Sequence, residues 1–182
     1  NYAVAEALLK AKGRVCGVAI RDILAERTAE VHAKVVVNAT GAWADRLRNQ
    51  AGGGKDIRPL RGSHIIFPFW RLPVAQTVAL MHPKDRRGVF ILPWEGVTVV
   101  GSTDLDHKED LDTEARITPG EVDYLLEVVH DQFPSLGIGS TDILSTYSGV
   151  RPVVAGGAPE PSKERRDHRI WVEEGLISVS GG

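Results

Sequence analysis

Several basic side chains stand in strand-like, otherwise apolar segments of this 182-residue chain. They are Arg61, His64, Arg86, Arg87 and Arg151. Burying an unpaired charge is costly, so an arginine in such a strand faces a carboxylate, an anionic ligand or water. The planar guanidinium suits phosphate recognition, and a histidine beside it could accept or deliver a proton near neutral pH. The alternative for each residue alone is a solvated charge on an exposed strand face.

Other kinds of site find little support in the sequence. The six histidines show no metal-ligand spacing, so we expect no metal site. No serine sits in a Gly-x-Ser-x-Gly elbow, and Cys16 has no context that suggests a nucleophile. The net charge of −2, without alternating basic and aromatic residues, argues against a nucleic-acid partner. No apolar run approaches the roughly 20 residues of a membrane helix.

A second candidate site lies at residues 35–43. Three consecutive valines predict a short strand buried on both faces, as is typical of a parallel sheet. The following residues, 38–41, are small and end in a glycine, so the backbone can turn tightly and approach a ligand closely. Ligands of open α/β sheets bind outside the carboxyl ends of strands, which makes this turn a candidate cofactor contact. An ordinary turn after a buried strand is the alternative.

The elements that must position these residues are mostly strands. Residues 1–33 indicate a small antiparallel meander, and 169–173 with 176–180 indicate a hairpin. Segments 57–68, 74–81, 88–93 and 97–101 together predict an antiparallel sheet of about four or five strands. Residues 143–154 are also strand-like. One or two helical turns follow at 45–50. Thr118-Pro119-Gly120-Glu121 is a capping box, and the helix behind it should stop before Pro134.

Several short motifs, in order along the chain, resemble those of the FAD-dependent glycerol-3-phosphate dehydrogenases, within the broader group of D-amino-acid-oxidase-like flavoproteins. The motifs are VNATGAW at 37–43, RGSHI at 61–65, ILPW at 91–94, GSTD at 101–104 and TYSGVRP at 146–152, with SGG at 180–182 as the start of another. Each motif alone is weak, but together and in order they are fairly specific.

The resemblance implies an α+β chain from an α/β parent. Its substrate domain would be an antiparallel or mixed β-sheet with helices on one side. The rest would be part of a FAD-binding, Rossmann-like domain that lacks its glycine-rich motif, since no Gly-x-Gly-x-x-Gly opens a βαβ unit here. Residues 1–46 and 147–182 would belong to the FAD-binding domain, and residues 47–146 to the substrate domain.

The resemblance also implies roles for particular residues. FAD would be contacted by Asn38, Ala39, Thr40, Gly41, Trp43, Gly181 and Gly182. Glycerol 3-phosphate would be bound by Arg61, Ser63, His64, Arg87 and Arg151, with His64 and Arg151 catalytic. The reaction would oxidise the secondary alcohol to dihydroxyacetone phosphate, with hydride passing to the flavin and a base removing the hydroxyl proton.

Further expectations concern the parent enzyme. Electrons would pass to a quinone, and the enzyme would be a homo-oligomer in the cytoplasm, peripheral on the cytoplasmic face of the inner membrane. The chain opens at Asn1 without Met and stops as a strand runs into two glycines, so we expect an internal fragment that is inactive when isolated.

Two alternatives remain from the sequence. A related FAD-dependent amine or amino-acid oxidase would bind a carboxylate, whereas a phosphate dianion calls for more than one arginine. A non-catalytic β-rich binding module would carry its arginines on the surface. Burial separates these possibilities, because a shared site requires His64, Arg87 and Arg151 to lie on one side of the sheet.

Overall fold

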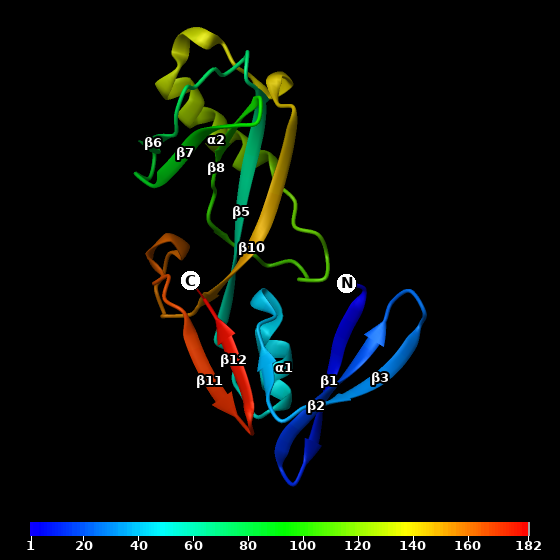
Figure 1. Cartoon of the computed structure of the whole chain (residues 1–182). Coiled ribbons are helices and arrows are strands. Elements are labelled where there is room, and N and C mark those ends of the chain that lie inside the picture. Colours follow the sequence, from blue (N-terminus) through cyan, green and yellow to red (C-terminus); the bar gives the residue numbers. More distant parts are fainter. Residues whose placement is uncertain (182) are drawn as a thin grey trace. The chain divides into compact units, whose positions relative to one another are not determined.

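Residues 1–181 are described by the computed structural model, in which the chain divides into two units (Figure 1). The first unit holds Asn1–Pro59, Pro152–Pro159 and the chain from Lys163 onward. The second holds Leu60–Arg151 with Glu160–Ser162. The predicted assignment of residues 1–46, 47–146 and 147–182 to FAD-binding and substrate domains stays a prediction.

The first unit begins with a three-stranded antiparallel sheet. Its strands are β1 (Ala3–Ala11), β2 (Arg14–Asp22) and β3 (Arg27–His32), in the order β1-β2-β3. Residues 12 and 13, at the first turn, have positive φ angles of 49° and 73°, which suits a tight hairpin. This sheet confirms the meander predicted for residues 1–33.

The second sheet of this unit contains the valine strand. Its order is β11 (Arg169–Glu173), β12 (Leu176–Ser180) and β4 (Val36–Asn38), with β11 and β12 antiparallel and β4 parallel to β12. The 3-10 helix η1 (Gly41–Trp43) and the helix α1 (Ala44–Gln50) follow β4. The predicted hairpin and helical turns are therefore confirmed, and so is the parallel pairing.

The prediction that the valine strand is buried on both faces is wrong. Val35 is 56% exposed and Val37 is 59% exposed, whereas Leu176 on the neighbouring strand is fully buried. The reason is that only one face of β4 is covered: Val36 packs on the cluster around Val15, Ala51 and Leu176, whereas Val37 points to the opposite face.

The second unit is built on a larger sheet. Its order is β10 (Ser145–Val154), β5 (Ile57–Pro68), β8 (Val97–Gly101), β7 (Gly88–Trp94) and β6 (Val78–Met81), with the short β9 (Leu105–Asp106) also paired to β5. β7 and β8 form the predicted hairpin, closed by residues 95 and 96 at φ angles of 45° and 86°. The predicted strand at 74–81 is shorter than expected.

Helix α2 (Pro119–Gln132) covers one face of this sheet (Figure 1). Thr118 and Glu121 form the predicted capping box, and the helix ends before Pro134. Leu125, Val128 and Val129 pack with Ile65, Phe67, Val89, Ile91 and Val100 of the strands. These contacts fix which side chains of each strand face the helix.

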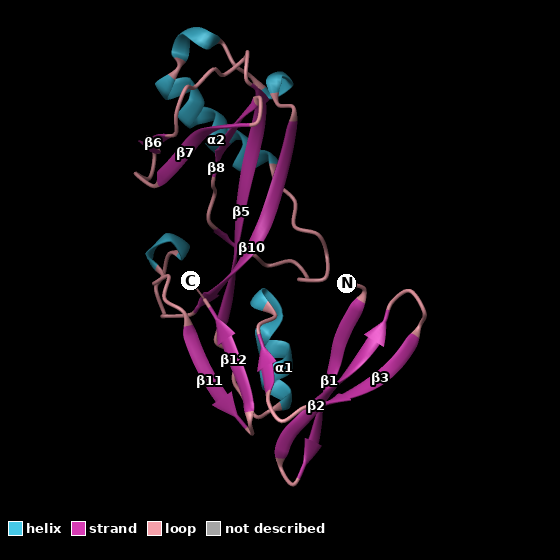
Figure 2. Ribbon diagram, in the orientation of Figure 1, coloured by secondary structure: helices cyan, strands magenta, loops and turns pink. Residues whose placement is uncertain are grey.

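Strands dominate the chain, with few helices (Figure 2). The remaining helical turns are η2 (Pro134–Leu136), η3 (Ser140–Asp142) and η4 (Pro161–Lys163). Mixed sheets with a small helical share make this an α+β chain, as expected. Within residues 1–181, none of the helices has the length and apolar character needed to span a membrane.

Candidate functional site

Strand β5 separates the predicted substrate residues onto two faces. Successive side chains of a strand point to opposite faces, and Ile65 and Phe67 of β5 pack in the core with α2. Arg61 and Ser63 therefore lie on the α2 face. Gly62 and His64 lie on the opposite, open face of the sheet. Only one of the three polar residues in this motif can thus reach a ligand on the open face.

On the open face, His64 is set between two neighbouring strands. It pairs in register with Gly101 of β8, and a Cβ atom built on Gly101 would lie 2.1 Å from His64 Cδ2, so the imidazole occupies that space. On the β10 side, the ring of Tyr147 is stacked on it, with centroids 4.4 Å apart and 7° between planes. The imidazole is thereby held at a defined place.

The environment of His64 favours the neutral imidazole. Burial lowers its pKa, and the positive charge of Arg151 lowers the pKa further. The Nδ1 atom is buried and has no hydrogen-bond partner among residues 1–181. A neutral histidine beside a cation can accept a proton near neutral pH.

Arg151 lies on the same face as His64. A Cβ atom on Gly62 would lie 2.1 Å from Arg151 Nη2, so the guanidinium passes directly over that glycine. Nη2 donates to Ser102 Oγ at 2.6 Å, while Nη1 donates to Thr103 O at 3.3 Å and to Asp104 Oδ1 at 3.1 Å. The side chain is 36% exposed, which leaves donors for a ligand.

Arg87 approaches the same carboxylate. Its Nη2 lies 3.9 Å from Asp104 Oδ2, and the Asp104 side chain is only 4% exposed. Arg87 also lines a cavity of about 230 Å³ together with Asp85, Thr103, Leu105, Thr118, Gly120, Glu121 and Tyr124. Arg87 and Arg151 therefore converge on one buried aspartate. Arg87 does so beside a cavity lined by residues of α2, whereas His64 lies near Arg151 on the open face.

Arg61 and Ser63 have a different partner, the buried Glu121 of α2. Arg61 Nη2 lies 2.9 Å from Glu121 Oε2, and Ser63 Oγ donates to Oε1 at 2.8 Å. Thr103 and Thr118 also donate to this carboxylate. Burial by itself would raise the pKa of Glu121, but these hydrogen bonds lower it overall. The substrate role of Arg61 and Ser63 stays a prediction, and both side chains already hold α2 on the sheet.

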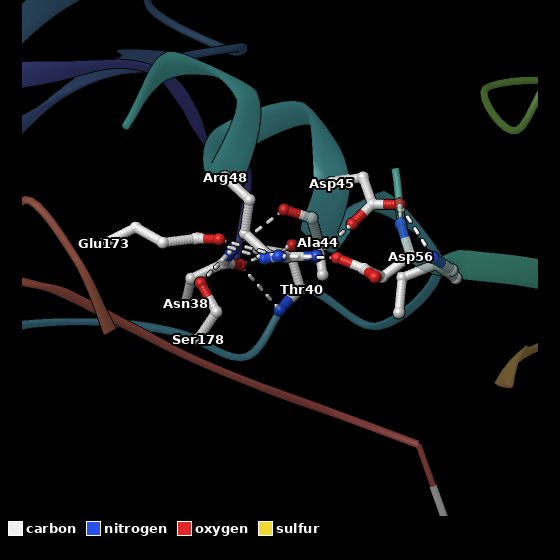
Figure 3. Close-up of polar contacts among 9 residues, drawn as sticks. Asn38, Thr40, Ala44, Asp45, Arg48, Asp56, Glu173 and Ser178 are labelled. Atoms are coloured by element: carbon white, nitrogen blue, oxygen red, sulfur yellow. Dashed lines mark hydrogen bonds and ion pairs between the residues drawn. The ribbon is translucent and has the colours of Figure 1, made fainter. Parts of the chain in front are cut away.

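A separate group of residues gathers where β4 and β12 end. Asn38 and Ser178 are partners in these two parallel strands, so the carboxyl ends of the strands are adjacent. The buried Asn38 amide donates to Ala44 O at 2.9 Å and to Ser178 Oγ at 3.1 Å (Figure 3). Its Oδ1 accepts from Thr40 Oγ1 at 2.8 Å. The buried Asn38 side chain therefore holds the backbone of this turn in place through its hydrogen bonds.

The outside of this turn is open. Ala39, Thr40 and Trp43 are exposed, and Gly41 has φ +62° with no atom within 4 Å of the place a Cβ would take. On the adjacent strand, Ser180 Oγ is buried without a partner in the described part of the chain. Ligands of open α/β sheets bind outside the carboxyl ends of the strands, which is where this open backbone and unpaired hydroxyl lie.

The terminal glycines are different. Gly181 has φ +95°, and a Cβ there would lie 2.5 Å from Asp167 O, so packing within the chain already requires glycine. Gly182 lies outside the described residues.

One cluster near this turn was not predicted from the sequence. Arg48 of α1 is 1% exposed and contacts three carboxylates, those of Asp45 at 2.8 Å, Asp56 at 2.8 Å and Glu173 at 2.7 Å (Figure 3). Its guanidinium also lies 4.1 Å from the ring centroid of Trp171. Burial by itself would lower the pKa of Arg48, but the three carboxylates raise it. The cluster anchors the helix that follows the Asn38 turn.

Comparison with protein families matches this chain to one family. A family described as FAD dependent oxidoreductase (DAO) matches residues 1–181. Among curated proteins, the chain is 38% identical over 185 residues to the aerobic glycerol-3-phosphate dehydrogenase of Bacillus subtilis (strain 168), which covers 100% of this chain and 33% of the relative. It is 37% identical over 163 residues to the alpha-glycerophosphate oxidase of Streptococcus pneumoniae, which covers 87% of this chain and 27% of the relative.

A solved structure is also similar. It is the X-ray structure of the glycerol-3-phosphate dehydrogenase from Bacillus halodurans complexed with FAD, with a TM-score of 0.88 and 33% identity. The match covers 100% of this chain and 35% of that one. The chain thus spans about a third of the length of these two glycerol-3-phosphate dehydrogenases.

Proposed function

This chain belongs to the FAD-dependent oxidoreductase family, and from that premise we propose that it serves the oxidation of sn-glycerol 3-phosphate to dihydroxyacetone phosphate. The family assignment confirms the resemblance that the sequence motifs indicated. Relatives named glycerol-3-phosphate dehydrogenase and alpha-glycerophosphate oxidase support the choice of substrate.

The observation that carries the proposal is the grouping of two arginines and a neutral histidine. Arg151 and Arg87 approach different oxygens of Asp104, and Arg151 also lowers the proton affinity of His64. Two guanidinium groups with donors to spare suit a phosphate dianion. A neutral imidazole near Arg151 suits the acceptance of a proton from a substrate hydroxyl.

The roles we propose follow from this geometry. Arg151 and Arg87 bind the phosphate and orient the substrate. His64 accepts the proton of the secondary hydroxyl as the carbon loses its hydride. We retain Arg61 and Ser63 among the proposed substrate-binding residues, although their contacts with Glu121 leave them fewer donors.

FAD fits the carboxyl edge of β4 and β12. The open backbone of Ala39–Gly41, the exposed Trp43 and the unpaired Ser180 Oγ would hold part of it, while Asn38 holds the turn in shape. Gly181 and the undescribed Gly182 stay in the proposed cofactor set. Bound FAD would supply the hydride acceptor. This chain's own contribution is binding, orientation and the proton acceptor.

We further propose that electrons leave to a quinone and that the enzyme is a homo-oligomer. It would lie in the cytoplasm, peripheral on the cytoplasmic face of the inner membrane. These proposals rest on the family resemblance. Activity that needs an added quinone analogue, and partition of the protein into a membrane fraction that salt removes, would support them.

The proposal is tested on the protein expressed from its complete reading frame. FAD is titrated while flavin absorbance is followed, and sn-glycerol 3-phosphate, glycerol and glycine are then added without oxygen. We expect only sn-glycerol 3-phosphate to bleach the flavin. Bleaching by amino acids alone would favour the amine or amino-acid oxidase, and failure to bind flavin at all would favour the β-rich binding module.

A further inference from the structure

The ring of Tyr147 stacks on one side of the His64 imidazole. The two rings are nearly parallel, and Tyr147 is 51% exposed, so its outer side is not packed in a core. With half of its surface exposed, Tyr147 gains only part of the free energy that full burial of an aromatic side chain provides. Its contact with the imidazole is the interaction that the structure shows for its ring.

Gly101 leaves the space that the His64 imidazole occupies on the β8 side. A Cβ at this position would overlap the ring, with Cγ at 2.7 Å and Nε2 at 2.8 Å as well as Cδ2. The backbone angle of Gly101 is not in the left-handed region, so close approach of His64 explains the glycine. Gly101 and Tyr147 come from the two strands that flank β5.

We propose that Tyr147 is a positioning residue that, together with Gly101, holds the His64 imidazole in the orientation from which it takes the substrate proton. This inference rests on the proposed function, because it concerns the same histidine. The aromatic face is the part that matters, since stacking depends on the ring. The hydroxyl has no part in it.

The test uses three variants of the protein expressed from its complete reading frame. Tyr147→Phe keeps the stacked ring, Tyr147→Leu removes it with a side chain of smaller but comparable bulk, and Gly101→Ala pushes on the imidazole from the β8 side. Two readouts are combined. One is the rate at which diethyl pyrocarbonate modifies His64 at pH 7, located by peptide mass spectrometry, and the other is the split between kcat and KM.

Removing the ring should expose and loosen the imidazole. We expect Tyr147→Leu to speed modification of His64 by about fivefold, while Tyr147→Phe matches the wild type. The kcat should fall about tenfold in Tyr147→Leu with little change in KM, because Arg87 and Arg151 are untouched. Gly101→Ala should also alter the modification rate of His64 and lower kcat. If Tyr147→Leu fails to fold, the two readouts on Gly101→Ala test the inference instead.

Equal modification rates in wild type, Tyr147→Leu and Gly101→Ala would overturn the inference. So would a Tyr147→Phe variant as impaired as Tyr147→Leu, since the hydroxyl would then be the important group. The modification assay needs no turnover. If the wild type does not oxidise sn-glycerol 3-phosphate, the proposed function fails while the positioning of His64 is still tested.

Discussion

Arg151 and Asp104 form an ion pair on the open face of the large sheet, with 3.1 Å between Nη1 and Oδ1. The carboxylate is buried and the guanidinium is partly exposed. A guanidinium whose Nη1 is held by a buried carboxylate keeps a fixed direction, and its remaining N–H groups stay available as donors. The pair therefore explains how a charged residue in the middle of a strand can serve a ligand.

Arg151→Ala should weaken the substrate complex strongly. Loss of charge-assisted hydrogen bonds to a phosphate should raise KM and lower kcat/KM by about 100-fold or more. Steady-state kinetics of the protein from its complete reading frame measure this. Arg165→Ala removes a cation that is 86% exposed and should leave kcat/KM unchanged. Unchanged kinetics in Arg151→Ala would remove this residue from the site.

Glu121→Ala should destabilise the second unit. The carboxylate is 2% exposed and pairs with the buried Arg61, so its loss leaves that guanidinium only the longer contact with the exposed Glu109, at 3.5 Å, and removes half of the capping box. We expect a decrease of about 3–5 kcal/mol in the free energy of unfolding, measured with urea. Glu127→Ala, on the same helix but in a surface pair with Lys84, should cost less than about 1 kcal/mol. Equal effects of the two substitutions would contradict the structural role of Glu121.

Arg48→Lys should destabilise the first unit. A lysine cannot present the planar fork that contacts Asp45, Asp56 and Glu173 together. The free energy of unfolding should fall by about 1–3 kcal/mol, because lysine keeps the charge but cannot make all of the charge-assisted hydrogen bonds that the guanidinium makes. Arg46→Lys on the exposed side of α1 is the matched control and should stay within about 0.5 kcal/mol. If both lysine variants unfold like the wild type, the cluster does not anchor α1.

Asp142 should make the free energy of unfolding depend on pH below about pH 4. Hydrogen bonds from Arg71, and then from the Gly139 backbone, lower the pKa of Asp142 from 3.8 to about 2. A carboxyl whose pKa is lower in the folded state stabilises the fold above its unfolded pKa, and this contribution is lost as pH falls. The stability difference between wild type and Asp142→Asn should therefore be constant near neutral pH and shrink from about pH 4 to about pH 2. Urea unfolding at a series of pH values measures the difference, and one that stays constant down to pH 2 would show that the Arg71 pair does not act on Asp142.

Local elements were readable from the sequence because short-range chemistry determines them. Thr118 and Glu121 are three residues apart, so the capping box follows from spacing alone. The turn at Glu95 and Gly96 follows in the same way from a glycine between two apolar runs. The motifs also sufficed to indicate the FAD-dependent family.

The exposure of the valine strand could not be predicted. Three valines indicate a strand, but whether one or both of its faces are covered depends on the rest of the fold. Here Val36 packs on a small core cluster, while Val37 points to the opposite face and is exposed. The two faces of β5 were partly predictable, since alternation alone separates Ser63 from His64.

The sequence by itself determined where the chain bends, caps and pairs locally, and which family it belongs to, because those features depend on residues that are neighbours in the chain. The tertiary structure decided which charges are already paired. Arg48 meets Glu173 across 125 positions, and Arg61 meets Glu121 across 60. The sequence around an arginine in a strand does not tell whether its guanidinium is buried in an ion pair, as in Arg61, or stays partly exposed and available to a ligand, as in Arg151. Only the packing of distant segments buries Arg61 beside Glu121 and leaves Arg151, although paired with Asp104, partly exposed.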